Sequence, residues 1–304
     1  MSSYIAIDDN LLKETVRIGR FKINKGAVMQ PCVSFWNAGV LPKMRIAGFP
    51  AALLAISLCC CQSAWAKAES TAVKKAAASG EACGIPSQAD SYVFAVSWQP
   101  AFCESKPDKP ECRIDDPKVY QASHFTLHGL WPNKTSCGTN YGYCGAAKEQ
   151  PANFCDYPEV SLSPEVRDKL AVVMPSVASG SCLERHEWHK HGSCQNGTAD
   201  QYYAQATALV HQFNDSGLSQ FMSGHIGKQV SLEGFRATLD ASLGQGASQH
   251  AKLGCKNGML VDIYLNLPAE LKPGASLKDL LALAPKAPAD NSCKNGFRID
   301  PIGQ

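Results

Sequence analysis

Cysteine constrains the fold of this chain more than any other residue type. The 304 residues include 14 cysteines, and such heavy use in a chain of enzyme size indicates an oxidising compartment, where disulfides form and persist. The hydrophobic content of 45% is enough for a real core, and the length suits one large domain or two small ones. We therefore expect a disulfide-cross-linked protein that is periplasmic or secreted.

An export signal supports this compartment. Met44 is followed by a basic residue and by the apolar run IAGFPAALLAISLCCC, and the tripeptide AWA at 64–66 has the form of a signal-peptidase site. The run of about 16 residues is short for a membrane-spanning helix, and no other stretch approaches that length. Residues 44–66 are therefore predicted to be a signal peptide cleaved before Lys67, and the mature form is expected to have no membrane segment.

The segments on either side of the signal are expected to lie outside the fold. Residues 1–43 would be an upstream extension, and residues 67–89, rich in Ala, Ser and Lys, would be a flexible N-terminal arm. The globular domain would cover residues 90–304. Lipid anchoring at the cysteines 59–61 is the alternative to cleavage, and it is disfavoured because no small residue sits just before them.

Cleavage would leave ten cysteines, enough for five disulfides whose pairing the sequence alone does not fix. They are Cys83, Cys103, Cys112, Cys137, Cys144, Cys155, Cys182, Cys194, Cys255 and Cys293. The formal net charge, +2 for the whole chain, becomes about −2 from Lys67 onward. A nucleic acid would therefore be held without a strong sequence-independent electrostatic attraction.

Strand and helix patterns follow one another in separate groups, which favours an α+β fold over a doubly wound sheet. Residues 133–160, with Gly, Asn, Pro and three cysteines, are expected to form a long cross-linked loop. The expected strands are 92–98, 123–132 and 259–267, and the expected helices are 161–175, 200–214 and 231–244, with a short helix in the tail. We expect a single domain with a central, mainly antiparallel sheet packed with helices.

The strand SHFTLHGLWP, residues 123–132, combines apolar residues with histidines. Side chains alternate between the faces of a strand, so Phe125 and Leu127 are expected in the core, with His124, Thr126 and His128 on the other face. Gly129 and Pro132 are expected to end the strand. His124 is more simply read as making a structural hydrogen bond.

The stretch HEWHKHGSC, residues 186–194, contains three of the eight histidines together with a glutamate and a lysine. Residues on a helix advance by about 100° each, so the side chains that share one face are His186, Glu187, Lys190 and His191. Trp188 and His189 would point away from that face, with His189 on the outer surface.

Zinc is the first alternative for this face, because HEWHKH begins like the HExxH metalloprotease motif. That motif needs a histidine four residues after the first, and this chain has Lys190 there. An ammonium group beside a divalent cation is electrostatically unfavourable. We therefore expect neither a metal nor another cofactor at this site.

A group of imidazoles, an ammonium and a carboxylate suits an anionic centre that gains negative charge in its transition state, as in phosphoryl transfer. Cleavage of RNA needs a base for the 2′-hydroxyl proton, an acid for the leaving 5′-oxygen and cations around the phosphorus. Two imidazoles can share the acid and base roles without a metal. His128, beside Gly129 at a strand end, is the candidate for the second histidine.

These segments resemble a known family. FTLHGLWP and HEWHKHGSC are similar to the two site segments of the ribonuclease T2 family, the acid, base-non-specific endoribonucleases, and most resemble its bacterial periplasmic type. VFAVSWQPAFC and QYYAQATALVHQFN resemble the family's first strand and a helix that follows the second segment, so the similarity covers about residues 90–300.

The resemblance implies roles for five residues. His191 resembles the general base and His128 the general acid, while His186 matches the histidine that binds phosphate. Glu187 and Lys190 match the pair that stabilises the pentacoordinate transition state. The substrate would be single-stranded RNA, and the product a 2′,3′-cyclic phosphate that is slowly opened to a 3′-phosphate.

Base binding is expected at four positions. Trp131 matches an aromatic residue that stacks on a base, although core packing is an alternative or additional role for it. Asn133 occupies a position that is often acidic in fungal members and helps to choose adenine, so little base specificity is expected. Tyr141 and Tyr143 are further candidates for base contacts.

The resemblance also implies a C-terminal Cys255–Cys293 disulfide. Cys103–Cys112 is expected as a local bridge, and the partner of Cys194 is expected among residues 137–155. Nothing in the sequence argues against a monomer. The rival functions are a catalytically inactive relative that binds RNA or a protein, a metal-dependent hydrolase, and a disulfide-rich structural protein. The five intact catalytic-type residues disfavour the first and the third.

Overall fold

A six-stranded sheet forms the centre of the computed structural model, which describes residues 83–303 without 147–148 and 289–291. The predicted extension at 1–43, the signal peptide and residues 67–82 of the predicted arm lie outside the described residues. The strands are β1 (Ser91–Ser97), β2 (Thr126–Asn133), β3 (Gln229–Val230), β4 (Ala251–Lys256), β5 (Met259–Pro268) and β6 (Phe297–Arg298). Every pairing is antiparallel except that of β5 with β6, so the predicted α+β class is confirmed.

Strand β2 runs further than the sequence suggests, and it contains a bulge. Gly129 and Pro132 do not end the strand, because it stays paired with β1 as far as Asn133. An edge strand tolerates Pro132, because the missing N–H can face away from the ladder. Val96 pairs with Leu127 and Ala95 with Gly129, so His128 between them is the extra residue of a β-bulge.

The start of β2 is buried on both faces. Phe125, Thr126 and Leu127 have exposed fractions of 0%, 1% and 2%, so Phe125 and Leu127 lie in the core as predicted. Thr126 is buried as well, and its hydroxyl donates to the carbonyl of Ser97. The alternation of buried and exposed positions that a half-exposed strand shows is therefore absent from these three residues.

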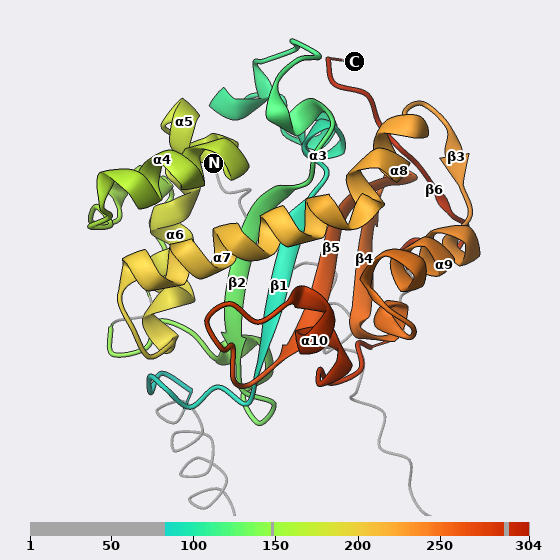
Figure 1. Cartoon of the computed structure of the whole chain (residues 1–304). Helices are drawn as coiled ribbons and strands as arrows, with labels where there is room; N and C mark the ends of the chain where they lie inside the picture. The colour runs from blue at the N-terminus through green and yellow to red at the C-terminus, as the bar shows by residue number, and fades with distance from the viewer. Residues whose placement is uncertain (1–82, 147–148, 289–291, 304) are drawn as a thin grey trace, which may run out of the picture. The chain divides into compact units, whose positions relative to one another are not determined.

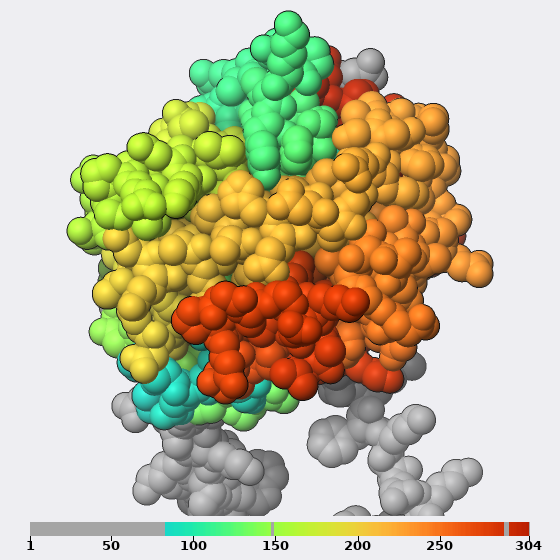
Figure 2. All heavy atoms as spheres, in the orientation of Figure 1, coloured from blue at the N-terminus to red at the C-terminus, as the bar shows by residue number. Residues whose placement is uncertain are grey.

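Eight α-helices surround the sheet in the described part of the chain. They are α3 (Gln99–Ser105), α4 (Pro164–Val173), α5 (Pro175–Ser179), α6 (Leu183–Lys190), α7 (Ala199–Phe213), α8 (Ser219–Gly224), α9 (Leu232–Leu243) and α10 (Leu277–Ala282). Helix α7 crosses one face of the sheet (Figure 1), and the segment that carries α10 packs beside it (Figure 2). In the described residues no helix combines the length and apolar character needed to cross a bilayer.

Helix α7 starts close to the predicted residue and packs against β2. Thr198 and Gln201 form a capping box, which satisfies two backbone N–H groups at the start of the helix. The buried hydroxyl of Tyr202 donates to the carbonyl of Leu130 over 2.8 Å. Phe213, near the other end of α7, packs edge-on against Phe125 at 5.1 Å. The helix therefore holds both halves of the strand that carries His128.

All ten cysteines of the described residues form disulfides: Cys83–Cys137, Cys103–Cys112, Cys144–Cys194, Cys155–Cys182 and Cys255–Cys293. The three pairings expected above are therefore confirmed. Within the predicted N-terminal arm, residues 83–89 are tied to the domain, because the backbone N–H of Ser87 also donates to the carbonyl of Cys194 over 2.9 Å.

Candidate active site

Helix α6 places Glu187 against strand β2, with His186 and His191 in the same group. His186 and Glu187 are 7% and 1% exposed, and His191 follows the last helical residue as the C-cap. The indole N–H of Trp131 donates to Glu187 Oε2 over 2.6 Å. This partly buried, charge-assisted hydrogen bond joins two residues that lie 56 positions apart in the sequence.

Gly129 is what allows this approach. A Cβ atom at residue 129 would fall far inside van der Waals contact with the Glu187 carboxylate and with Nε1 of Trp131. The glycine of the HGLW segment is thus explained by the close approach of a side chain from α6, rather than by the end of a strand.

The ring of Trp131 contacts the rings of two histidines. It meets His128 edge-on, with ring centroids 5.2 Å apart, and lies at 27° to the His191 ring, also at 5.2 Å. The packing role considered for Trp131 is therefore present. A base-stacking role remains a prediction, and the side chain is partly exposed.

His128 contacts a carboxylate that the sequence analysis did not single out. Its Nδ1 lies 3.2 Å from Oδ1 of Asp262 on β5. Burial lowers the pKa of His128, but the hydrogen bond and charge of Asp262, together with the charge of Glu187, outweigh burial and the opposing Lys190, so the pKa is raised. The available signal was a lone carboxylate in the apolar strand MLVDIYLNL.

His186 and His191 shift in the opposite direction. Burial, followed by the charge of Lys190, lowers the pKa of His186 to about 3 and lowers that of His191 well below its ordinary value. Phe154, which the sequence analysis also missed, stacks on His186 with ring centroids 4.2 Å apart. Two imidazoles are thus held neutral beside a third that favours its charged form.

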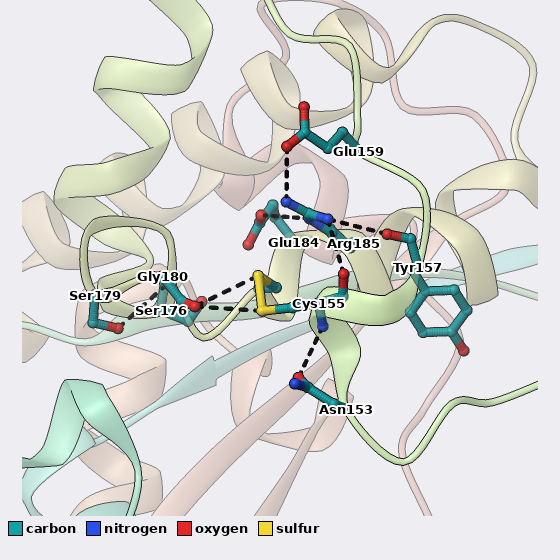
Figure 3. Close-up of a disulfide and its surroundings, with 10 residues drawn as sticks. Asn153, Cys155, Tyr157, Glu159, Ser176, Ser179, Gly180, Glu184 and Arg185 are labelled. Atoms are coloured by element: carbon teal, nitrogen blue, oxygen red, sulfur yellow. Dashed lines mark hydrogen bonds and ion pairs between the residues drawn. A yellow bond between two sulfur atoms is a disulfide. The ribbon is translucent and has the colours of Figure 1, made fainter.

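Arg185 of α6 binds the loop that carries Phe154 through hydrogen bonds and an ion pair, and we call these contacts the Arg185 latch (Figure 3). The guanidinium donates to the carbonyls of Cys155 and Tyr157 over 3.0 and 3.1 Å, and to the carboxylate of Glu159 over 3.2 Å. The Cys155–Cys182 disulfide joins the same loop to the residue before the helix. Together these bonds fix the Phe154 ring against the residue next to Arg185.

The other three predicted base contacts have intramolecular partners. Asn133 donates its side-chain amide to Ser91 Oγ over 3.1 Å. Tyr141 is only 3% exposed, and its hydroxyl donates to the carbonyl of Ile85 over 3.0 Å. The Tyr143 hydroxyl lies 3.4 Å from that of Tyr157. Tyr141 is thus part of the interior. Tyr143 lies near the end of α6, where its backbone N–H donates to the backbone carbonyl of Lys190.

A metal ion would find three donors here, although not in the HExxH arrangement. Ligand atoms of His186, Glu187 and His191 lie within 4.8 Å of one another, with His191 placed at the C-cap of α6. Two nitrogens and one carboxylate suit zinc, but Glu187 Oε2 already accepts from Trp131. His189 lies apart from this group, with its ring stacked on Tyr157 at 5.2 Å.

A model of the Ribonuclease T2 family matches residues 89–274, well over half of the chain. The chain belongs to the ribonuclease T2 family. Ribonuclease I of Escherichia coli strain K12 is 30% identical over 238 residues, which cover 70% of this chain and 87% of that protein. Ribonuclease 1 of Arabidopsis thaliana is 29% identical over 180 residues, 58% of this chain and 74% of that one.

Among solved structures, a self-incompatibility-associated ribonuclease of Nicotiana alata superposes with a TM-score of 0.47 and 14% identity, covering 69% of this chain and 98% of that one. The family match begins just before β1 and extends beyond β5. It therefore includes FTLHGLWP, HEWHKHGSC and the strand that carries Asp262.

Substitution Gly129→Ala tests the close approach of β2 to α6. We expect the free energy of unfolding to fall by about 1–3 kcal/mol, because the added methyl group overpacks the site, and RNA cleavage to fall with it. Gly224→Ala is the matched control, since the structure places nothing within 4 Å of a Cβ there. Equal stability of the two variants in urea titrations would contradict the prediction.

Substitution Arg185→Ala tests the latch. Losing hydrogen bonds from a charged group should lower the free energy of unfolding by about 1.5–3 kcal/mol. A loosened loop exposes His186, so its pKa should rise from about 3 towards the ordinary value in an NMR titration. Glu159→Gln removes only the charge of the exposed partner and should change little. An unshifted His186 in Arg185→Ala would show that the loop is held by other contacts.

Proposed function

We propose that this endoribonuclease of the ribonuclease T2 family cleaves single-stranded RNA, with little base specificity, by metal-independent transphosphorylation between two histidines. The observation that carries the proposal is that His128 and His191 both contact Trp131, each with ring centroids 5.2 Å apart, while His128 alone is hydrogen-bonded to the carboxylate of Asp262. The pKa of His128 is raised while that of His191 is lowered. His128 therefore favours the form that gives a proton, and His191 the form that accepts one.

In the first step His191 takes the proton of the 2′-hydroxyl, and the 2′-oxygen attacks phosphorus. The bond from phosphorus to the 5′-oxygen breaks, and His128 protonates that oxygen. The products are a 2′,3′-cyclic phosphate and a free 5′-hydroxyl. In the second step water takes the place of the leaving alcohol and the two histidines exchange roles, which opens the cycle to a 3′-phosphate.

The remaining side chains stabilise the charge that develops on phosphorus. Lys190 carries the ammonium group, whose field is felt at all three histidines of the site. Glu187, fixed by Trp131, would assist at the pentacoordinate phosphorus. His186 would contact the phosphate as a neutral hydrogen-bond donor rather than as a cation. Its Nδ1 is buried without a hydrogen-bond partner among the described residues.

Base contacts are proposed at the partly exposed Trp131, whose stacking is sequence-tolerant, and at Asn133 and Tyr143. A base could reach the buried ring of Tyr141 only if the surrounding loop opened. The lack of a basic stripe fits an enzyme that holds only a short piece of single-stranded RNA. We place the enzyme in the periplasm or outside the cell, as a monomer, and its five disulfides suit an oxidising compartment.

The test is cleavage of a dinucleotide and of single-stranded RNA by the purified, oxidised protein in EDTA. The pH profile of kcat/KM should be bell-shaped. The acid limb should lie well below pH 6.5, because His191 must be neutral and its pKa is lowered. The alkaline limb should lie above pH 6.5, because His128 must be charged and its pKa is raised.

Alanine at His191 or His128 should each lower the rate by about 10²–10⁴ and remove its own limb of the profile. His211→Ala, on the exposed side of α7, is the control and should leave the profile unchanged. Folded protein that binds RNA without cleaving it would support the inactive-relative alternative. Cleavage that EDTA abolishes would support a metal at His186, Glu187 and His191.

A further inference from the structure

We propose that Asp262 is a positioning residue of this ribonuclease, which holds His128 by Nδ1 so that Nε2 faces the leaving oxygen. This inference rests on the proposed function, because it assigns a partner to the proposed general acid. Asp262 is 3% exposed and sits in β5 between the buried residues Val261 and Ile263. A carboxylate in such surroundings is costly unless it is fully hydrogen-bonded.

Three side chains from three neighbouring strands meet this carboxylate. Oδ1 accepts from Ser97 Oγ on β1 over 2.6 Å and faces His128 Nδ1 on β2 over 3.2 Å. Oδ2 accepts from the Tyr264 hydroxyl over 3.1 Å. Both carboxylate oxygens are therefore engaged, and the two hydroxyl donors fix the direction in which Asp262 points before any substrate arrives.

The strand register explains how His128 reaches across the sheet. β1 lies between β2 and β5, and Ser97 is paired with Asp262. His128 is the extra residue of the β2 bulge, opposite the step between Ala95 and Val96. Bulges next to active sites re-aim a side chain, and this one places the imidazole within reach of a carboxylate two strands away.

Holding Nδ1 has two chemical consequences. In the imidazolium form, the proton on Nε2 is the one left for the 5′-oxygen. After that proton has gone, Nδ1 keeps its own proton for Asp262, and the bare Nε2 is ready to take a proton from water in the second step. The carboxylate therefore fixes the tautomer as well as the orientation of the ring.

Asp262 also acts on the charge of His128. The charged and titratable groups facing this imidazole are Asp262 from β5, Glu187 and Lys190 from α6, and the neighbouring His186 and His191. Glu187 raises the pKa of His128 and Lys190 lowers it, but the hydrogen bond comes from Asp262 alone. Asp262→Asn keeps the shape and removes the charge.

The first readout compares two substrates that differ in their need for a general acid. With uridylyl-3′,5′-uridine we expect Asp262→Asn to lower kcat by about 10–100-fold, as loss of a partner that orients a functional histidine does elsewhere. The alkaline limb should move down by about 1–2 pH units, as expected for loss of an adjacent opposite charge. With uridine 3′-(4-nitrophenyl phosphate), whose leaving group needs no proton, kcat should be nearly unchanged.

A purely structural role for Asp262 would damage both substrates alike, and equal losses would overturn the proposal. Tyr264→Phe provides a second variant in case Asp262→Asn does not fold. It leaves the charge but removes one donor, so the carboxylate becomes more basic towards His128. The alkaline limb should then move up, and an unmoved limb would count equally against Asp262.

NMR of histidine labelled with ¹⁵N separates this inference from the proposed function. The wild-type ring should show Nδ1 protonated at every pH, and Asp262→Asn should lower the pKa of His128 by about 1–2 units. These shifts do not depend on RNA cleavage. An inactive enzyme with the expected shifts would overturn the function alone, while normal cleavage with an unshifted His128 would overturn the role of Asp262.

Discussion

The contact between β2 and α6 has room for a hydrogen atom at residue 129 and for nothing larger. Through this gap the Trp131 indole reaches the Glu187 carboxylate, and the indole also contacts the rings of His128 and His191. Neither segment alone contains the site. Tyr202 of α7 holds β2 through a hydrogen bond to Leu130. Arg185 and the Cys155–Cys182 disulfide hold the loop beside α6. These contacts support the close approach of β2 to α6, which one added methyl group at residue 129 would disrupt.

Three chemically identical side chains are given different properties by their surroundings. Burial, followed by the charge of Lys190, lowers the pKa of His186 and of His191, so both favour the neutral form. His128 is buried as well, but a carboxylate reverses the effect of burial. The three histidines therefore differ in pKa because of the loop, the helix and the strand that pack around them.

The sequence predicts those parts of the fold that local patterns encode. The predicted helix 200–214 is Ala199–Phe213 in the structure, because caps and helical spacing are local signals. Asp262 and Phe154 could not be assigned, since their roles arise from strand register and from how a long loop folds back. The predicted end of the strand at Gly129 failed for the same reason, because pairing with β1 overrides the local preference of glycine.

The bulge at His128 makes the number of residues in β2 decisive for where this imidazole points. In a regular strand, side chains alternate without interruption, and losing one residue moves every later side chain to the other face. Deleting a neighbouring residue of β2 would remove the bulge and keep His128 in the chain, yet it would turn the imidazole away from Asp262. The direction of the His128 side chain therefore depends on the exact number of residues in β2, and a list of the site's side chains does not show this dependence.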